Sequence, residues 1–343
     1  MQSTPTIDPA YLTARKLVTD MARKTRGEIS LAVRGLWFDR IRIETSDGQI
    51  WIEIPVAGIS YSTSTAVPKI EALRQMLTEG GRQCFILPDL DLARNSDAFC
   101  YSLKLNGSTV FEMLNRGPGA YKLVPFFAIG EKLAVLHATS LRQIESTTFK
   151  RQGFVPIREF LRGNLEPELL GTLRSSLECC RDVELLVEQA EDEIDRDEKT
   201  LLHGRWSSGA MVSSSSTEIA ALSGVDCWFG PAAFDAGYFL GEIIELAADL
   251  FAVKQRASYS SLIDAAELFL CGYRSRRVLL NVSILRFIGH RIISHLAANI
   301  LWRRNERIAL PTAAEISQIL SIVSVVLKEF ESRLDRQKVE FAS

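Results

Sequence analysis

Two periods of apolar and polar residues divide this chain of 343 residues. In the first third, five short segments alternate with a period of two, at residues 29–33, 40–44, 50–56, 84–87 and 98–105. Such alternation predicts strands with one buried face. Between the second and third segments, Asp47 and Gly48 form a typical hairpin turn signal. The first third of the chain therefore predicts an antiparallel sheet.

Most of the remaining chain repeats its apolar positions at helical spacing. Two helices are predicted early, at residues 9–26 and 66–80, and six later, at residues 123–139, 166–190, 234–256, 261–272, 279–303 and 312–335. Residues 201–230 form a non-helical island, with two short strands around a turn of four serines. We therefore expect an α+β fold with a small β-rich N-lobe, residues 1–105, and a large helical C-lobe, residues 106–343.

Charge and composition exclude several classes of protein. Lys plus Arg number 40 against 42 Asp plus Glu, for a formal charge of -2, and no basic run exceeds two residues. This balance weighs against nucleic acid or anionic lipid as a partner. No segment reaches the ~18 apolar residues of a membrane span, and the first thirty residues lack the apolar core of an export signal. A cytoplasmic location is expected.

Three motifs after residue 105 carry the most information about function. Residues 201–210 read Leu-Leu-His-Gly-Arg-Trp-Ser-Ser-Gly-Ala, residues 229–237 read Phe-Gly-Pro-Ala-Ala-Phe-Asp-Ala-Gly, and residues 133–138 read Leu-Ala-Val-Leu-His-Ala. The first resembles the catalytic loop of aminoglycoside phosphotransferases and methylthioribose kinases, His-Gly-Asp-(Leu)-His-x-Gly-(Asn/Ser). The others resemble the Tyr-Gly-Pro-x-x-Phe-Asp-x-Gly run and the Leu-Ala-x-Leu-His helix of the same families. This resemblance implies a two-lobed, protein-kinase-like fold.

The catalytic loop departs from that family at the residues that perform phosphoryl transfer. Such transfer needs a carboxylate that orients the acceptor hydroxyl and oxygen ligands for Mg²⁺. By resemblance, Arg205 takes the place of the catalytic Asp, and a guanidinium cannot accept a proton. Ala210 takes the place of the Asn or Ser ligand and offers no side-chain oxygen, and Ser207 replaces the second His.

The N-lobe departs from the family as well. The phosphate-pairing Lys or Arg corresponds to Glu53, whereas the helix Glu that usually pairs with it is present as Glu71. Two carboxylates would then face each other and repel, unless a proton or another cation lies between them. The loop that should cover a nucleotide, residues 33–38, holds one glycine and two bulky aromatic residues, which makes close approach to phosphates difficult.

The metal-binding aspartate of the family has two candidate positions. Counting back from Asp235 at the methylthioribose kinase interval reaches Ser223, which would remove the metal carboxylate. Matching residues 224–228, Gly-Val-Asp-Cys-Trp, to the aminoglycoside phosphotransferase pattern places the ligand at Asp226 instead. The residues favour neither alternative.

Other family features are retained. His203 and Gly204 match the loop motif, and Asp235 resembles the family aspartate that accepts hydrogen bonds from catalytic-loop amides. His137 lies on an apolar helix face, which favours a core histidine that is fully hydrogen-bonded. Arg205, Trp206 and Trp228 together could line a pocket for an anionic or planar ligand. The predicted cleft residues are Glu53, Glu71, His203, Arg205, Trp206, Asp226, Trp228 and Asp235.

These substitutions together predict a pseudokinase, which keeps the fold and binds a partner protein or small ligand as a regulatory subunit. They weigh against Mg-ATP as a cofactor. Two alternatives remain open: a small-molecule phosphotransferase with displaced catalytic residues, and an enzyme of different chemistry that acts on an anionic metabolite or modified peptide through Arg205. The fold alone does not separate these three.

Overall fold

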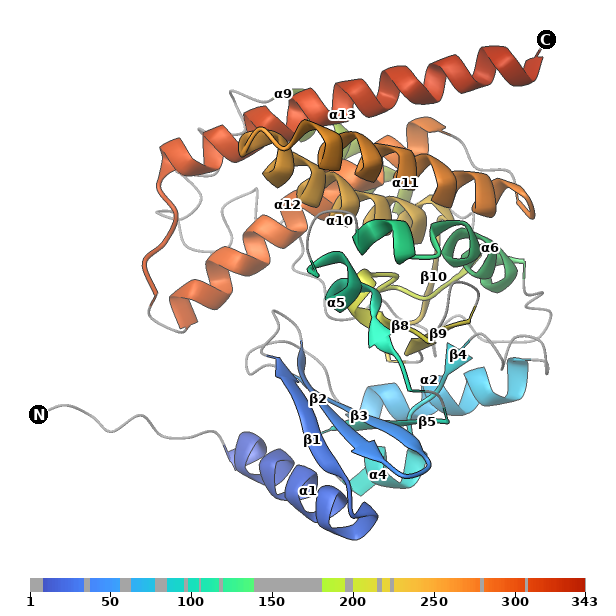
Figure 1. Ribbon diagram of the computed structural model, residues 1–343, viewed down its shortest axis with the longest axis vertical. Coiled ribbons are helices and arrows are strands. Elements are labelled where there is room, and N and C mark those ends of the chain that lie inside the picture. The colour runs from blue at the N-terminus through green and yellow to red at the C-terminus, as the bar shows by residue number, and fades with distance from the viewer. Residues whose placement is uncertain are drawn as a thin grey trace, which may run out of the picture.

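In the residues that it describes, the computed structural model contains helices and three small sheets (Figure 1). It describes residues 9–33, 38–55, 63–77, 85–95, 98–104, 106–116, 120–138, 181–194, 200–214, 218–222, 225–277, 281–305 and 308–342. The strands are β1 Glu28–Val33, β2 Phe38–Thr45, β3 Gly48–Pro55, β4 Phe85–Ile86, β5 Phe99–Leu103, β6 Ser108–Thr109, β7 Thr200–Leu202, β8 Met211–Ser213, β9 Ile219–Leu222 and β10 Trp228–Gly230. The helices are α1 Pro9–Thr25, α2 Thr63–Met76, α4 Leu90–Asn95, α5 Val110–Leu114, η1 Ala120–Leu123, α6 Phe126–His137, α9 Arg181–Ile194, η2 Ser208–Ala210, α10 Ala233–Ala252, α11 Arg256–Arg274, α12 Asn281–Asn305 and α13 Ala313–Ala342.

The N-terminal sheet has the antiparallel order β1-β2-β3-β5 and is covered on both faces. Its central strand β3 alternates between two environments. Ile50, Ile52 and Ile54 pack toward α1, which contributes Val18, and α1 lies against the sheet on the side away from the helical part (Figure 1). Trp51 belongs to a second cluster, formed with α2 and α4. Because side chains alternate along a strand, Glu53 shares the face of Trp51.

The hairpin between β2 and β3 sets which side chains face each other. Thr45 pairs with Gly48, so the turn contains two residues. This register places Arg40 opposite Glu53 and Arg42 opposite Trp51. The guanidinium carbon of Arg42 lies 5.4 Å from the Trp51 ring centroid. Arg40 and Arg42 on β2 therefore lie beside Glu53 and Trp51 on the same face of the sheet.

A second sheet, β4-β9-β8-β6, joins strands from both sides of residue 105. β4 pairs in parallel with β9, whereas β6 pairs antiparallel with β8. The non-helical island also contributes β7 and β10, which pair with each other. The lobe boundary at residue 105 stays a prediction. The sheet connects the island firmly to the strand-rich part of the chain.

Helices α6, α10, α11, α12 and α13 build the large core of the C-terminal part (Figure 1). The acidic run from residue 188 predicts a solvated helix face on charge alone; Glu188 and Asp192 are exposed, whereas Glu191 and Glu193 are half-buried and contact α12. Glu191 lies 2.7 Å from the ring of His290, and Glu193 pairs with Arg286 at 2.9 Å. Glu191 and Glu193 therefore help to hold α9 against α12. None of the described helices combines the length and apolar character that crossing a membrane requires.

Most predicted elements are present with shifted ends. α6 begins at Phe126 rather than residue 123, directly after Pro125. α10 ends at Ala252 rather than residue 256, because the backbone turns at Lys254 with φ of 60°. The sequence did not predict α4, β6 and α5, which are too short for a recognisable period. Of the helix predicted at 166–190, the part before residue 181 lies outside the described residues.

Candidate functional site

Arg205 joins the non-helical island to the N-terminal sheet. Its Nη2 lies 2.8 Å from Oε2 of Glu53, and its Nε lies 2.7 Å from Oδ2 of Asp226. The exposed side-chain fractions are 12% for Arg205, 0% for Glu53 and 3% for Asp226. One guanidinium is thus shared by two buried carboxylates that come from β3 and from the segment before β10.

Three N-terminal side chains complete the surroundings of these ion pairs. Arg40 donates from Nε to Oε1 of Glu53 at 2.7 Å, so Glu53 lies between two guanidinium groups. The hydroxyl of Tyr101 donates to Oε2 of Glu53 at 3.1 Å. The ring of Phe38 lies 4.3 Å from the guanidinium carbon of Arg205, a cation–π distance. We call Arg40, Glu53, Arg205 and Asp226 the charge network.

The charge network changes the pKa of its buried groups. Burial by itself would raise the pKa of Glu53, but Arg205 and Arg40 more than offset this and lower it from 4.5 to about 2. Burial lowers the pKa of Lys69 on α2, and the nearby Cys227 and Asp226 oppose that shift only in part. Burial and the charge of Glu53 raise the pKa of Tyr101, which keeps its hydroxyl protonated as a donor.

The repulsion expected between Glu53 and Glu71 does not set the charge of Glu53. The groups that shift its pKa are Arg205 and Arg40. Glu71 is half-buried on α2. The buried cation of that helix is Lys69, which is 1% exposed. The charge of Glu53 is therefore offset by two guanidinium groups, those of Arg40 and Arg205.

Sequence reasoning missed Arg40, Lys69 and Tyr101. Two of them had a signal. A two-residue hairpin turn after Thr45 already places Arg40 opposite Glu53. Lys69 lies three residues after Ala66 and four before Leu73, on the apolar stripe of its helix. Tyr101 had no such signal, because the pairing of β3 with β5 depends on the intervening chain.

Asp235 holds the loop that carries Arg205. Its two carboxylate oxygens accept the backbone N–H of His203 at 2.7 Å and of Gly204 at 2.9 Å, as the family resemblance implied. Gly204 has φ of +80°, and a Cβ there would lie 2.0 Å from the backbone oxygen of Asp226. The loop therefore requires glycine at this position, and it brings residues 204 and 226 into direct contact.

Two buried histidines, both with neutral rings, hold the loop in place. Burial lowers the pKa of both His137 and His203. Nε2 of His203 lies 3.0 Å from the carbonyl oxygen of Leu222, so this nitrogen carries the proton and Nδ1 accepts the N–H of Arg205. His137 lies between the Tyr273 hydroxyl at 2.8 Å and Asp235 at 3.1 Å. Both rings have structural hydrogen bonds on each nitrogen.

The two tryptophans of the predicted cleft pack in the core. Trp206 is 0% exposed and lies against Phe85 and His203, with ring centroids 6.2 and 5.2 Å apart. Trp228 packs edge-on against Phe234 at 5.0 Å. The cavity between the strand-rich and helical parts, with a volume of about 760 Å³, is lined by neither of them nor by Arg205. The structure thus separates the indoles from the described cavity.

The residues present do not fit a Mg²⁺ ion in the manner of the family. Asp226 pairs with the guanidinium of Arg205, whose permanent charge repels a cation. Ala210 has no side-chain oxygen and is 0% exposed. Within the described ranges, no three His, Cys, Asp or Glu side chains gather as a metal site would require. The alternative ligand, Ser223, and four of the six residues of the loop at 33–38 lie outside the described residues.

The stability of the protein is expected to fall as pH drops from 4.5 toward 2, in part through Glu53. A carboxylate whose pKa is lower in the folded state stabilises that state above its unfolded pKa, and this contribution disappears as pH falls through the folded value. Urea unfolding should therefore show that the difference in free energy of unfolding between the native protein and Glu53→Gln shrinks by about 2 kcal/mol as pH falls from 5 to 3. A constant difference across that range would contradict the assigned charge of Glu53.

Comparison with known proteins shows which fold the chain has. No protein-family model and no curated protein sequence matches the chain. A spectinomycin phosphotransferase in complex with ADP and spectinomycin is similar with a TM-score of 0.57 at 11% identity, over 92% of this chain and 98% of that chain. Choline kinase from Streptococcus pneumoniae has a TM-score of 0.53 at 12% identity, over 92% of this chain and 99% of that chain. A thermostable mutant of an aminoglycoside phosphotransferase has a TM-score of 0.51 at 11% identity, over 91% of this chain and 98% of that chain. The predicted α+β architecture is confirmed: the chain has the two-lobed, kinase-like fold of the aminoglycoside phosphotransferases.

Proposed function

We propose that this protein is a pseudokinase, a kinase-like protein impaired in phosphoryl transfer that acts as a binding or regulatory subunit in the cytoplasm. The observation that carries the proposal is the position of Arg205. Its guanidinium bridges Glu53 and Asp226 in a buried site, at 2.8 and 2.7 Å. In a phosphotransferase the residue at this loop position must accept or orient a proton, which arginine cannot do.

The energetics of the charge network support this proposal. Asp226 could hold a cation only if Arg205 moved away. Removing one partner from a buried ion pair leaves an uncompensated charge, at a cost of about 3–5 kcal/mol. Glu53 would meanwhile present a negative charge to nucleotide phosphates. Binding of Mg-ATP would have to supply this free energy before any transfer could begin.

The same contacts weigh against an enzyme that binds an anionic substrate through Arg205. Its charge is already offset by two carboxylates, and its side chain is 12% exposed. An incoming anion would compete with Glu53 and Asp226 for the same N–H donors. The proposed binding role therefore requires another surface.

Addition of Mg-ATP is expected to leave the melting temperature unchanged, because a ligand stabilises a protein only if it binds the native state. The measurement is thermal unfolding with and without millimolar Mg-ATP, combined with an assay for released phosphate. Asp226→Ala is the test variant. Asp264→Ala, at a side chain 66% exposed on α11, is the control. A clear thermal shift with phosphate release that is lost in Asp226→Ala but kept in Asp264→Ala would overturn the proposal.

A further inference from the structure

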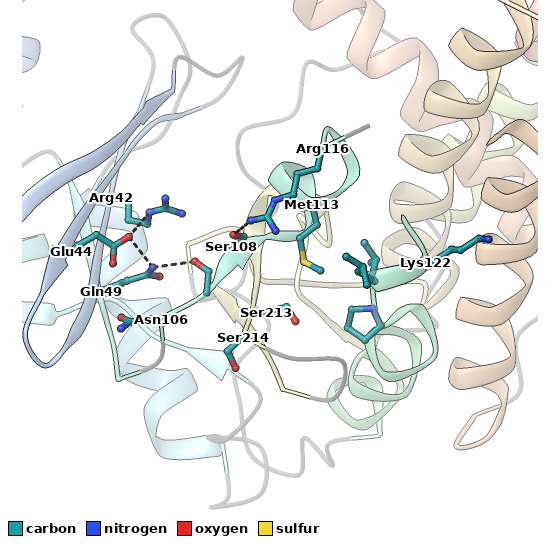
Figure 2. Close-up of a pocket in the computed structure, with 14 residues that line it drawn as sticks. Arg42, Glu44, Gln49, Asn106, Ser108, Met113, Arg116, Lys122, Ser213 and Ser214 are labelled. Carbon is teal, nitrogen blue, oxygen red and sulfur yellow. Dashed lines mark hydrogen bonds and ion pairs between the residues drawn. The ribbon is translucent and has the colours of Figure 1, made fainter. Parts of the chain in front are cut away.

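A cavity of about 760 Å³ lies between the strand-rich and helical parts (Figure 2), and its lining includes no residue of the charge network. This volume is within the range of pockets for small molecules. Gln49 lines the cavity and precedes Glu53 by four residues on β3, which corresponds to about 13 Å along a strand. The cavity is lined by Arg42, Glu44, Gln49, Asn106, Gly107, Ser108, Met113, Arg116, Lys122, Leu123, Val124, Pro125, Ser213 and Ser214.

The wall formed by β2 and β3 is held in place by its own charges. Arg42 lies 2.9 Å from Glu44 and 3.1 Å from Glu112 on α5, so two carboxylates offset its charge. Nε2 of Gln49 donates to Glu44 and to the carbonyl oxygen of Gly107, both at 3.0 Å. Figure 2 shows the contacts among Arg42, Glu44 and Gln49 along one side of the cavity. The pairs with Glu112 and Gly107 also join this wall to the opposite one, so the cavity is formed in advance of a ligand.

The opposite wall carries positive charge that the described residues do not offset. Arg116, just after α5, donates from Nη2 to the hydroxyl oxygen of Ser108. Among the described residues, no carboxylate forms an ion pair with Arg116 or with Lys122 at the rim. Because the Ser108 oxygen accepts from Arg116, its own proton remains available for donation. Arg116 and Ser108 together present donors to an acidic group.

The remaining lining suits a hydroxylated body. Ser213 and the amide of Asn106 provide hydroxyl and amide groups, whereas the hydroxyl of Ser214 donates to the carboxylate of Glu218. Met113 and Leu123 are among the apolar side chains that can cover the carbon skeleton. A pocket that is mainly apolar or aromatic would favour a planar ring, whereas this one mixes short polar groups with aliphatic ones.

We propose that this cavity binds a small hydroxylated metabolite with one phosphate or carboxylate group, which Arg116 and Ser108 recognise. A guanidinium binds either acid in the same forked geometry. The inference rests on the proposed binding role and names its ligand class. It does not depend on the absence of phosphoryl transfer, since the site involves none of the charge network.

Calorimetric titration with glucose 6-phosphate, gluconate and glucose tests the proposal. At least one acid is expected to bind the native protein about tenfold more tightly than glucose, since the acidic group supplies the contact with Arg116. Arg116→Ala should weaken that acid about tenfold, and Arg116→Lys should give an intermediate affinity because it keeps the charge without the fork. Arg23→Ala, at an exposed arginine of α1, is the matched control and should bind like the native protein.

The relative affinities of the two acids identify the acidic group. Absence of binding by both at 10 mM, or equal affinity in Arg116→Ala and the native protein, would rule the site out. The titrations contain no nucleotide. Failure here therefore leaves the Mg-ATP result unaffected, and phosphate release from Mg-ATP would leave acid binding at Arg116 unaffected.

Discussion

Replacement of Arg205 by methionine is expected to lower the free energy of unfolding by about 3–5 kcal/mol. Methionine retains an unbranched side chain but removes the cation shared by Glu53 and Asp226. Glu53 keeps Arg40 as a partner, whereas the ion pair of Asp226 with Arg205 is lost. Urea unfolding at neutral pH measures the loss.

Two further variants separate the buried charge from a general effect of removing arginine. Arg276→Met removes a guanidinium that is 59% exposed and pairs with Glu131 at 2.8 Å, so its cost should stay below about 1 kcal/mol. Adding Glu53→Gln and Asp226→Asn to Arg205→Met should restore part of the stability, because neutral amides then replace both carboxylates. If Arg205→Met is no more harmful than Arg276→Met, the charge network does not hold the two parts of the site together.

Replacement of Asp235 by alanine should lower the free energy of unfolding by a similar or larger amount, about 3–9 kcal/mol. The change removes the acceptor of three buried donors, the N–H groups of His203 and Gly204 and the ring of His137. Each buried donor without a partner costs about 1–3 kcal/mol. Thermal or urea unfolding measures the sum, and amide hydrogen exchange at residues 203 and 204 should become faster.

Asp235→Asn distinguishes lost acceptors from lost charge. Asparagine keeps one acceptor oxygen, so its cost should lie between those of the native protein and Asp235→Ala. Asp264→Ala, at a 66% exposed carboxylate that pairs with Arg333, should cost less than about 1 kcal/mol. Unchanged exchange at residues 203 and 204 in Asp235→Ala would show that the loop is held by other contacts.

The architecture could be predicted well because its signals are local. Alternation placed β1, β2, β3 and β5 within one or two residues of their ends, and helical spacing placed α10 to α13. The resemblance of three motifs then gave the two-lobed fold. The short elements β6 and α5 were missed, although they support the cavity wall, because an element of two to five residues holds less than one full period of its pattern.

The candidate site could be predicted only in part. The residue types at positions 53 and 205 can be read directly, and by resemblance to the family their exchanged charges led to the proposal that phosphoryl transfer is impaired. It could not assign partners: Glu53 was expected opposite Glu71, but it lies between Arg40 and Arg205. Trp206 and Trp228 were expected near a ligand, but they pack in the core, because motif position alone does not tell which way a side chain points.

Residue types and periodicity therefore determined the α+β fold, the positions of the three motifs and the arginine at residue 205, since each can be read from residues that are close together in the chain. The tertiary structure alone decided that Arg205 meets Glu53, 152 residues away, and that the same guanidinium reaches Asp226. It also placed Arg116 beside Ser108 at a cavity away from these charges. Such contacts depend on how strands and loops pack in three dimensions, and burial then sets the strength of their charges.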